Sequence, residues 1–225
     1  MKVSDYFEKN EFEKLIEEFF SYICENEYEI YNEFSFQHEL GFFLRNKFLN
    51  NCIDGKEYKI EFERNAKKHF NINYNLIKKE IDISIYKKDH SMQYAIELKF
   101  PLNRQYSEQM FNFIKDVRFM QELVNQKKFN KTYCITLVLA VGRGKPFFRG
   151  NHEGTYNIDI YKYFRGYKEL LKGRIIKPTG YDKYAIDLED KEYPFDWKDC
   201  KIIYFNEIKN EYMYRKCKYY IIECK

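Results

Sequence analysis

The sequence predicts an α/β fold in which a central mixed β-sheet is flanked by helices and followed by a C-terminal extension. Two patterns lead to this expectation. Some segments place apolar residues at helical spacing, and others alternate apolar and polar residues one by one, as strands do. After an N-terminal helix, the order through residue 141 is helix, three strands, helix and strand, an alternation typical of layered α/β proteins.

Two helices are expected before the first strand. Residues 8–25 carry one apolar stripe, and a second helix should run from residue 36 to about residue 48 with Ser35 as its N-terminal cap. We expect residues 1–34 to form a helical segment packed on a core of residues 35–150. The stripe of the first helix consists of Phe12, Leu15, Ile16, Phe19, Phe20 and Ile23.

Three strands are expected next, over residues 58–63, 79–86 and 94–100, and residues 87–91 should join the last two as a hairpin. The second strand would place Ile81, Ile83 and Ile85 on one face and Glu80, Asp82 and Ser84 on the other. The third would place Ile96, Leu98 and Phe100 on one face and Ala95, Glu97 and Lys99 on the other.

The second half of the predicted core is a long helix followed by a strand. Ser107 should cap the helix, in which Asp116 and Arg118 lie off the apolar stripe and are expected to face solvent. A β-like segment, 132–141, follows the helix. The extension, residues 151–225, should serve substrate recognition or oligomerisation and contain a C-terminal hairpin over residues 200–223.

The charge distribution permits nucleic-acid binding without requiring it. The net charge is +4, but residues 1–40 hold only three basic side chains against eleven acidic ones, so the remainder is basic. Six cysteines lack any CxxC pair and are expected to be reduced thiols. With no signal sequence and no apolar segment of the ~20 residues that span a bilayer, we expect a soluble cytoplasmic protein without membrane contact.

One acidic-x-lysine sequence has a context that points to chemistry. Such tripeptides occur eight times, but only Glu97 and Lys99 lie in an alternating strand that follows a second alternating strand with its own acid, Asp82. Strands in a hairpin lie about 5 Å apart, so the three side chains should converge. Two carboxylates beside one lysine suit a site for Mg²⁺, whose bound water the lysine would orient and help deprotonate. The alternative is an ordinary surface ion pair.

The segments Ile81-Asp-Ile-Ser-Ile and Ala95-Ile-Glu-Leu-Lys-Phe resemble the PD-(D/E)XK nuclease superfamily, and the resemblance covers residues 35–141. It implies a restriction-endonuclease-like core with the order αβββαβ. It also implies that Asp82, Glu97 and the carbonyl of Leu98 bind Mg²⁺, for which Mn²⁺ could substitute, and that Lys99 positions the attacking water. Ile81 stands where the motif has proline, a departure that is frequent in this superfamily.

Further residues are candidates for supporting roles. Members of the superfamily often take another metal-binding acid from the first core helix, where this chain has Glu39, although an ordinary exposed glutamate explains it equally. Glu80 and Gln109 are auxiliary candidates. The segment 142–150 offers cations for the DNA backbone, or is simply a charged surface turn; they are Arg143, Lys145 and Arg149.

The predicted function is therefore Mg²⁺-dependent hydrolysis of phosphodiester bonds, in DNA rather than RNA, of the restriction, defence or repair type. A homodimer is compatible with this function. The alternatives are a non-catalytic nucleic-acid-binding or assembly module on the same scaffold, and an enzyme that acts on small nucleotides.

Overall fold

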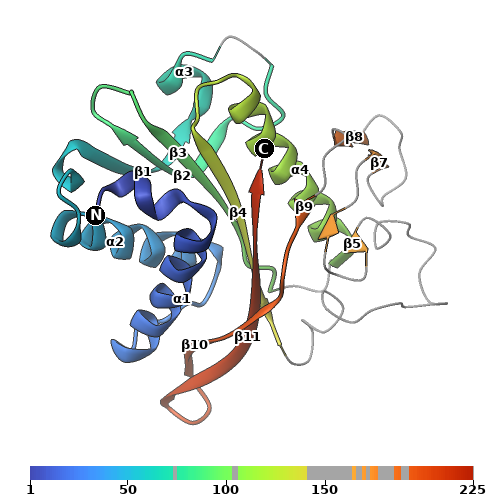
Figure 1. The fold of residues 1–225 in the computed structure, drawn as a ribbon. Helices are drawn as coiled ribbons and strands as arrows, with labels where there is room; N and C mark the ends of the chain where they lie inside the picture. The colour runs from blue at the N-terminus through green and yellow to red at the C-terminus, as the bar shows by residue number, and fades with distance from the viewer. Residues whose placement is uncertain are drawn as a thin grey trace.

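The computed structural model describes residues 1–72, 75–102, 106–140, 164–165, 169–170, 173–176, 185–188 and 193–224. Its centre is a six-stranded sheet with the order β1-β2-β3-β4-β11-β10 (Figure 1). β3 and β4 are parallel and the other neighbours are antiparallel, so the predicted mixed sheet is confirmed. The strands are β1 (Tyr58–Asn65), β2 (Glu80–Lys87), β3 (Gln93–Lys99), β4 (Lys131–Leu139), β10 (Lys198–Asn206) and β11 (Glu211–Cys224).

Helices cover both faces of this sheet. α1 (Lys9–Glu25) and α2 (Glu33–Asn51) lie on one face, and α4 (Tyr106–Asn125) lies on the other (Figure 1). The apolar side chains accordingly form two clusters, one under α1 and α2 and one under α4. Shorter elements complete the N-terminal half: η1 (Val3–Phe7), η2 (Gly55–Glu57) and α3 (Ala66–Phe70).

The prediction for α1 is confirmed, because all six residues of its stripe are buried. Two of them pack on aromatic rings of the sheet. Phe12 stacks on Tyr133 with the ring centroids 3.9 Å apart, and Phe20 lies 4.7 Å from the ring of Tyr219. These contacts join the N-terminal segment to strands β4 and β11.

α2 begins earlier than the sequence predicts. Asn32 is its N-cap, and the side chain of Asn32 accepts a hydrogen bond from Ser35 N at 2.8 Å. Ser35 Oγ accepts one in return from Asn32 N at 3.0 Å, so the expectation that Ser35 itself caps the helix is wrong. This reciprocal pair is a capping box, and it places Glu33 inside the first turn.

The alternation of β2 breaks at Asp82. Ile83 and Ile85 pack under α1 and α2 as predicted, but Ile81 packs under α4, so the three isoleucines do not share a face. The pairing of β2 with β3 ends at Ile83, and Glu63, opposite Asp82 in β1, has a left-handed φ of 52°. Both features interrupt the regular pleat, and they leave Asp82 where the strands part.

The C-terminal residues complete the main sheet. β10 and β11 form the predicted hairpin, and β11 pairs with β4 along its second half. Residues 198–224 thus share one sheet with the predicted core. Between β4 and β10 the described residues form two small sheets, made of β5 (Phe164–Arg165), β6 (Glu169–Leu170) and β9 (Tyr193–Pro194), and of β7 (Gly173–Ile176) and β8 (Ala185–Leu188).

Among the described residues, no helix combines the length and the apolarity of a membrane-spanning segment.

Candidate active site

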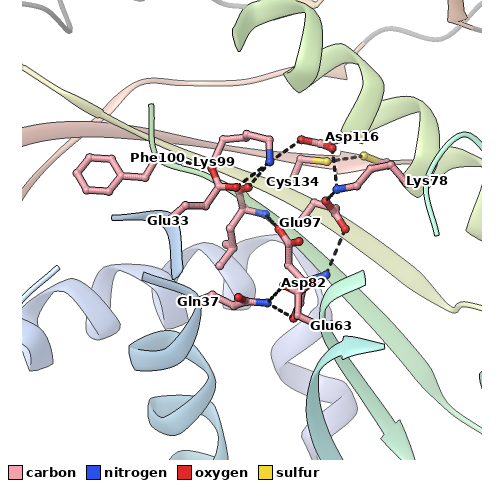
Figure 2. Close-up of polar contacts among 12 residues, drawn as sticks. Glu33, Gln37, Glu63, Lys78, Asp82, Glu97, Lys99, Phe100, Asp116 and Cys134 are labelled. Carbon is pink, nitrogen blue, oxygen red and sulfur yellow. Dashed lines mark hydrogen bonds and ion pairs between the residues drawn. The ribbon is translucent and has the colours of Figure 1, made fainter. Parts of the chain in front are cut away.

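The three predicted catalytic residues meet where β2 and β3 separate (Figure 2). Asp82 Oδ2 accepts a hydrogen bond from Leu98 N at 2.8 Å, and Glu97 Oε1 lies 3.3 Å from Asp82 N, which donates to it. Lys99 follows on the same strand, with its Nζ 3.0 Å from Leu98 O. Side-chain carboxylates therefore replace the backbone ladder between the two strands at this point.

Burial and neighbouring charges raise the pKa values of Asp82 and Glu97. Glu97 is only 1% exposed. Burial raises the pKa of Glu97 well above its usual range, and the neighbouring carboxylates of Asp82 and Asp116 raise it further. Burial also raises the pKa of Asp82 to about 6, although Lys78 and Lys99 partly oppose the shift. Two adjacent buried carboxylates of this kind favour the binding of a cation.

Asp116 of α4 belongs to the site, contrary to the expectation that it faces solvent. It is 3% exposed, and its Oδ1 lies 3.0 Å from Lys78 Nζ while its Oδ2 lies 3.3 Å from Lys99 Nζ. Asp116 follows Phe113 by three residues and precedes Met120 by four, so at 3.6 residues per turn it lies on the apolar stripe that faces the sheet, and the expectation that it lies off the stripe is wrong. An acid flanked by apolar residues on a helix after the motif is the signal that could have identified it.

Lys78 is a second basic residue that the sequence analysis missed. Its Nζ binds Glu97 Oε2 as well as Asp116, and its side chain is 21% exposed. Burial lowers the pKa of Lys78, but the carboxylates of Asp116, Glu97 and Asp82 outweigh burial, and the pKa is raised. Lys78 lies between α3 and β2, outside any helix or strand, so no periodic pattern marked it.

The first turns of α2 supply two more groups. Glu33 Oε1 lies 3.0 Å from Lys99 Nζ, and Glu33 Oε2 accepts a hydrogen bond from Phe100 N at 3.0 Å. One turn later, Gln37 Nε2 donates to Asp82 O at 2.5 Å and to Glu63 Oε1 at 2.8 Å. The expected start of the helix at residue 36 had left Glu33 out of consideration.

Glu39, the predicted ligand from α2, faces another part of the molecule. At 3.6 residues per turn, it lies about 200° around the helix from Gln37, which does reach the site. Its neighbours are His38 and, on α1, Tyr22. Burial raises the pKa of Glu39. The structure thus brings Glu33 and Gln37 to the site in place of Glu39.

Two of the remaining candidates, Glu80 and Gln109, lie among the described residues. Glu80, at the start of β2, is exposed and pairs with Asn65 of β1. Gln109 is partly buried and lies on the same side of α4 as Asp116, about 10 Å away along the helix. The cations Arg143, Lys145 and Arg149 lie outside the described residues.

The donor chemistry of this site fits a hard divalent cation. Carboxylate oxygens are the ligands that Mg²⁺ prefers, and buried Asp116 Oδ2 makes no hydrogen bond, only the contact with Lys99. Among the described residues, however, no three acidic, histidine or cysteine side chains are already arranged as a metal site. Lys78 explains this, because its ammonium lies between two of the acids. The site thus holds two ammonium groups, of Lys78 and Lys99, and four carboxylates: Glu33, Asp82, Glu97 and Asp116.

Comparisons of the chain with protein-family models, with curated proteins and with solved structures found no match. The functional argument therefore depends on the geometry of the site.

Proposed function

We propose that this protein is a Mg²⁺-dependent nuclease of the restriction-endonuclease-like class that hydrolyses phosphodiester bonds, in DNA rather than RNA. The observation that carries the proposal is the convergence of Asp82, Glu97 and Lys99 where two neighbouring strands part. A purely structural role gives no reason to hold two acids together with so little solvent, since burying like charges is costly.

The order of the elements supports the same class. α2, β1, β2, β3, α4 and β4 follow one another in the αβββαβ order of the PD-(D/E)XK core, with the short α3 inserted after β1. Fold similarity does not define an activity, so this agreement adds to the argument from the site and does not replace it.

In the proposed reaction Asp82, Glu97 and the carbonyl of Leu98 would hold the metal. When bound, the metal supplies positive charge to the scissile phosphate and lowers the pKa of a water molecule. Burial lowers the pKa of Lys99, but Asp116, Glu33 and Asp82 together raise it, so the ammonium remains charged at neutral pH. Lys99 accordingly acts as a hydrogen-bond donor that orients water and phosphate, and not as a base.

Lys78 competes with a metal for the same acids. Its ammonium binds Glu97 and Asp116 and thereby offsets their repulsion in the metal-free protein. A cation that binds these oxygens has to displace Lys78, which can move because it lies outside regular secondary structure.

The experiment is incubation with plasmid, linear and single-stranded DNA in the presence of Mg²⁺ or Mn²⁺. Wild-type protein should degrade at least one substrate only when metal is present, and Lys99→Ala and Glu97→Gln should be inactive. Glu80→Gln is the matched control, because Glu80 is an exposed acid near the site. A wild-type protein that leaves every substrate intact contradicts the proposal.

One observation favours a second candidate, the non-catalytic nucleic-acid-binding or assembly module. Lys78 and Lys99 already pair with the acids of the site, as they would in a permanent ion-pair network. The two functions differ in their response to metal. Mn²⁺ should raise the melting temperature of a nuclease, and Asp82→Ala should abolish the rise, whereas the module should show neither effect.

A further inference from the structure

A polar cavity lies near Gln93, at the end of β3 that is opposite the candidate active site. It has a volume of about 370 Å³ and opens between α3, the turn that joins β2 to β3, and the turn that joins α4 to β4. Ligand sites typically begin near this size. Buried rings of Phe70 and Phe129 contribute to its lining, and eight polar residues contribute as well: His69, Asn71, His90, Ser91, Gln93, Lys127, Lys128 and Asn130.

Three chain reversals build the rim of this cavity. Asn71 ends α3, His90 lies in the β2–β3 turn and Lys127 follows α4, and all three have a left-handed backbone with φ of 52°, 59° and 53°. Residues other than glycine adopt this conformation uncommonly. Each reversal is the local end of an element, and together they bring three polar side chains to one opening.

The charge of the lining suits a phosphate group. Lys127 and Lys128 are exposed at the rim, and no carboxylate side chain is among the described residues that line the cavity. Adjacent lysines attract phosphate through charge, with an affinity that falls as salt rises.

The rings suit a nucleic-acid base. The His90 imidazole stacks on Tyr86, with the centroids 4.9 Å apart and the planes 17° from parallel. His90 is exposed, and its ring also lies 5.8 Å from the ring of His69 and 6.0 Å from the ring of Phe70, so it belongs to an aromatic cluster that reaches the surface. Stacking of bases on such rings is a sequence-tolerant way to hold nucleic acid.

Two polar side chains of the lining have unused hydrogen-bonding capacity. Gln93 is 7% exposed, and its Oε1 makes no hydrogen bond, while its Nε2 makes only a long one to His90 O at 3.4 Å. His69 Nε2 is also buried without a hydrogen bond, although Glu61 Oε2 lies 3.7 Å from it. A rotation of the Gln93 amide would present a donor or an acceptor to the edge of a base.

We propose that this cavity binds one nucleotide, with its phosphate against Lys127 and Lys128 and its base against His90 and Gln93. Gln93 and Glu97 lie four residues apart on β3, about 13 Å. A nucleic-acid strand that crosses the active site could therefore place a nearby nucleotide here. The proposed function bears only on whether the nucleotide belongs to a nucleic-acid strand. A free nucleotide would satisfy the same contacts.

The test measures binding in EDTA, so that hydrolysis plays no part. A fluorescent single-stranded oligonucleotide is titrated by anisotropy, and a nucleoside monophosphate is added as competitor. Lys127→Gln/Lys128→Gln should weaken the oligonucleotide affinity about tenfold and reduce its salt dependence by about one phosphate contact. Gln93→Leu should weaken competition by the monophosphate. Lys209→Gln/Lys216→Gln, the same charge change at exposed positions of the β10–β11 hairpin, should have no effect.

The two proposals fail separately. If the monophosphate competes, the cavity binds a free nucleotide. If only the oligonucleotide binds, the cavity binds a nucleotide that is part of a strand. Equal affinity of the Lys127/Lys128 double variant and its control overturns the cavity, even if the wild type cleaves DNA. Binding that depends on the cavity, in a protein that cleaves nothing, keeps the cavity and overturns the nuclease.

Discussion

The ammonium of Lys99 lies 3.3 Å from Asp116 Oδ2, which joins the end of β3 to the middle of α4. The same carboxylate binds Lys78 through its other oxygen. One acid of α4 therefore positions both basic groups of the candidate active site, and the first two predictions below follow from this arrangement.

Asp116→Asn should destabilise the protein by about 2 kcal/mol, because it removes a counter-charge that two partly buried lysines share, while Glu97 and Glu33 still pair with them. Asparagine has nearly the same shape, so lost packing cannot account for the effect. Urea unfolding at neutral pH measures it. Glu80→Gln, which removes an exposed acid, should change the free energy of unfolding by less than about 0.5 kcal/mol. Equal effects of the two substitutions would show that Asp116 has no special role.

Lys78→Met should make the metal-free protein less stable and its response to metal larger. The substitution leaves Glu97 and Asp116 adjacent without an ammonium between them, and a divalent cation then binds without displacing one. If the metal affinity rises tenfold, saturating Mn²⁺ stabilises the variant by about 1.4 kcal/mol more than it stabilises the wild type. Thermal melts with and without Mn²⁺ measure this difference. Identical metal-induced shifts would contradict the competition between Lys78 and metal.

Glu61 should contribute to the acid sensitivity of the fold. A hydrogen bond from Arg64 lowers the pKa of Glu61 to about 2; burial opposes this shift, and a hydrogen bond from Tyr86 adds to it. Since the folded pKa lies below the unfolded value of 4.5, the stabilisation is complete above about pH 4.5 and is lost as the pH falls toward 2. After solvent screening we expect about 1–2 kcal/mol.

Glu61→Gln tests this expectation. Its free energy of unfolding, measured in urea from pH 7 to pH 2.5, should fall less steeply with acid than that of the wild type. Parallel curves for the two proteins would rule out the contribution of Glu61.

Gly55→Ala should destabilise the protein by about 2 kcal/mol or more. A β-carbon at Gly55 would collide with the backbone oxygen of Phe48, which cannot move without distorting the end of α2. Gly41→Ala is the comparison, because its β-carbon would meet only the outer ring atoms of Phe62, which can turn aside. The melting temperature of Gly55→Ala should be well below that of Gly41→Ala. The reverse order would contradict this explanation.

The central strands could be predicted because their pattern has a period of two. Alternation placed Glu97 and Lys99 on one face of β3, and the structure confirms that face. The same reasoning failed one strand away at Ile81, because a local interruption of the ladder is not encoded in alternation. The site residue Asp82 lies at that interruption.

The other residues of the site could not be predicted for different physical reasons. Lys78 lies in an irregular segment, which has no period to read. Glu33 was hidden by a capping box that starts α2 before its first apolar residues. Asp116 was missed because it is a charged residue on the apolar stripe of α4, and only its contacts with Lys78 and Lys99 explain its burial. The positions of Lys78 and Asp116 depend on tertiary contacts, whereas the start of α2 at Glu33 is a local feature that the sequence does contain.

The position of β11 in the sheet has a consequence for how the chain acquires its structure. Thr132 of β4 and Cys224 of β11 are paired although they are 92 positions apart, so β4 has an open edge until residues 211–224 have been synthesised. Contacts between such distant residues form slowly, and an open strand edge invites association with other chains. Shortened chains that lack β11 should therefore aggregate during synthesis, and the pairing of this strand with β4 is what closes that edge in the finished protein.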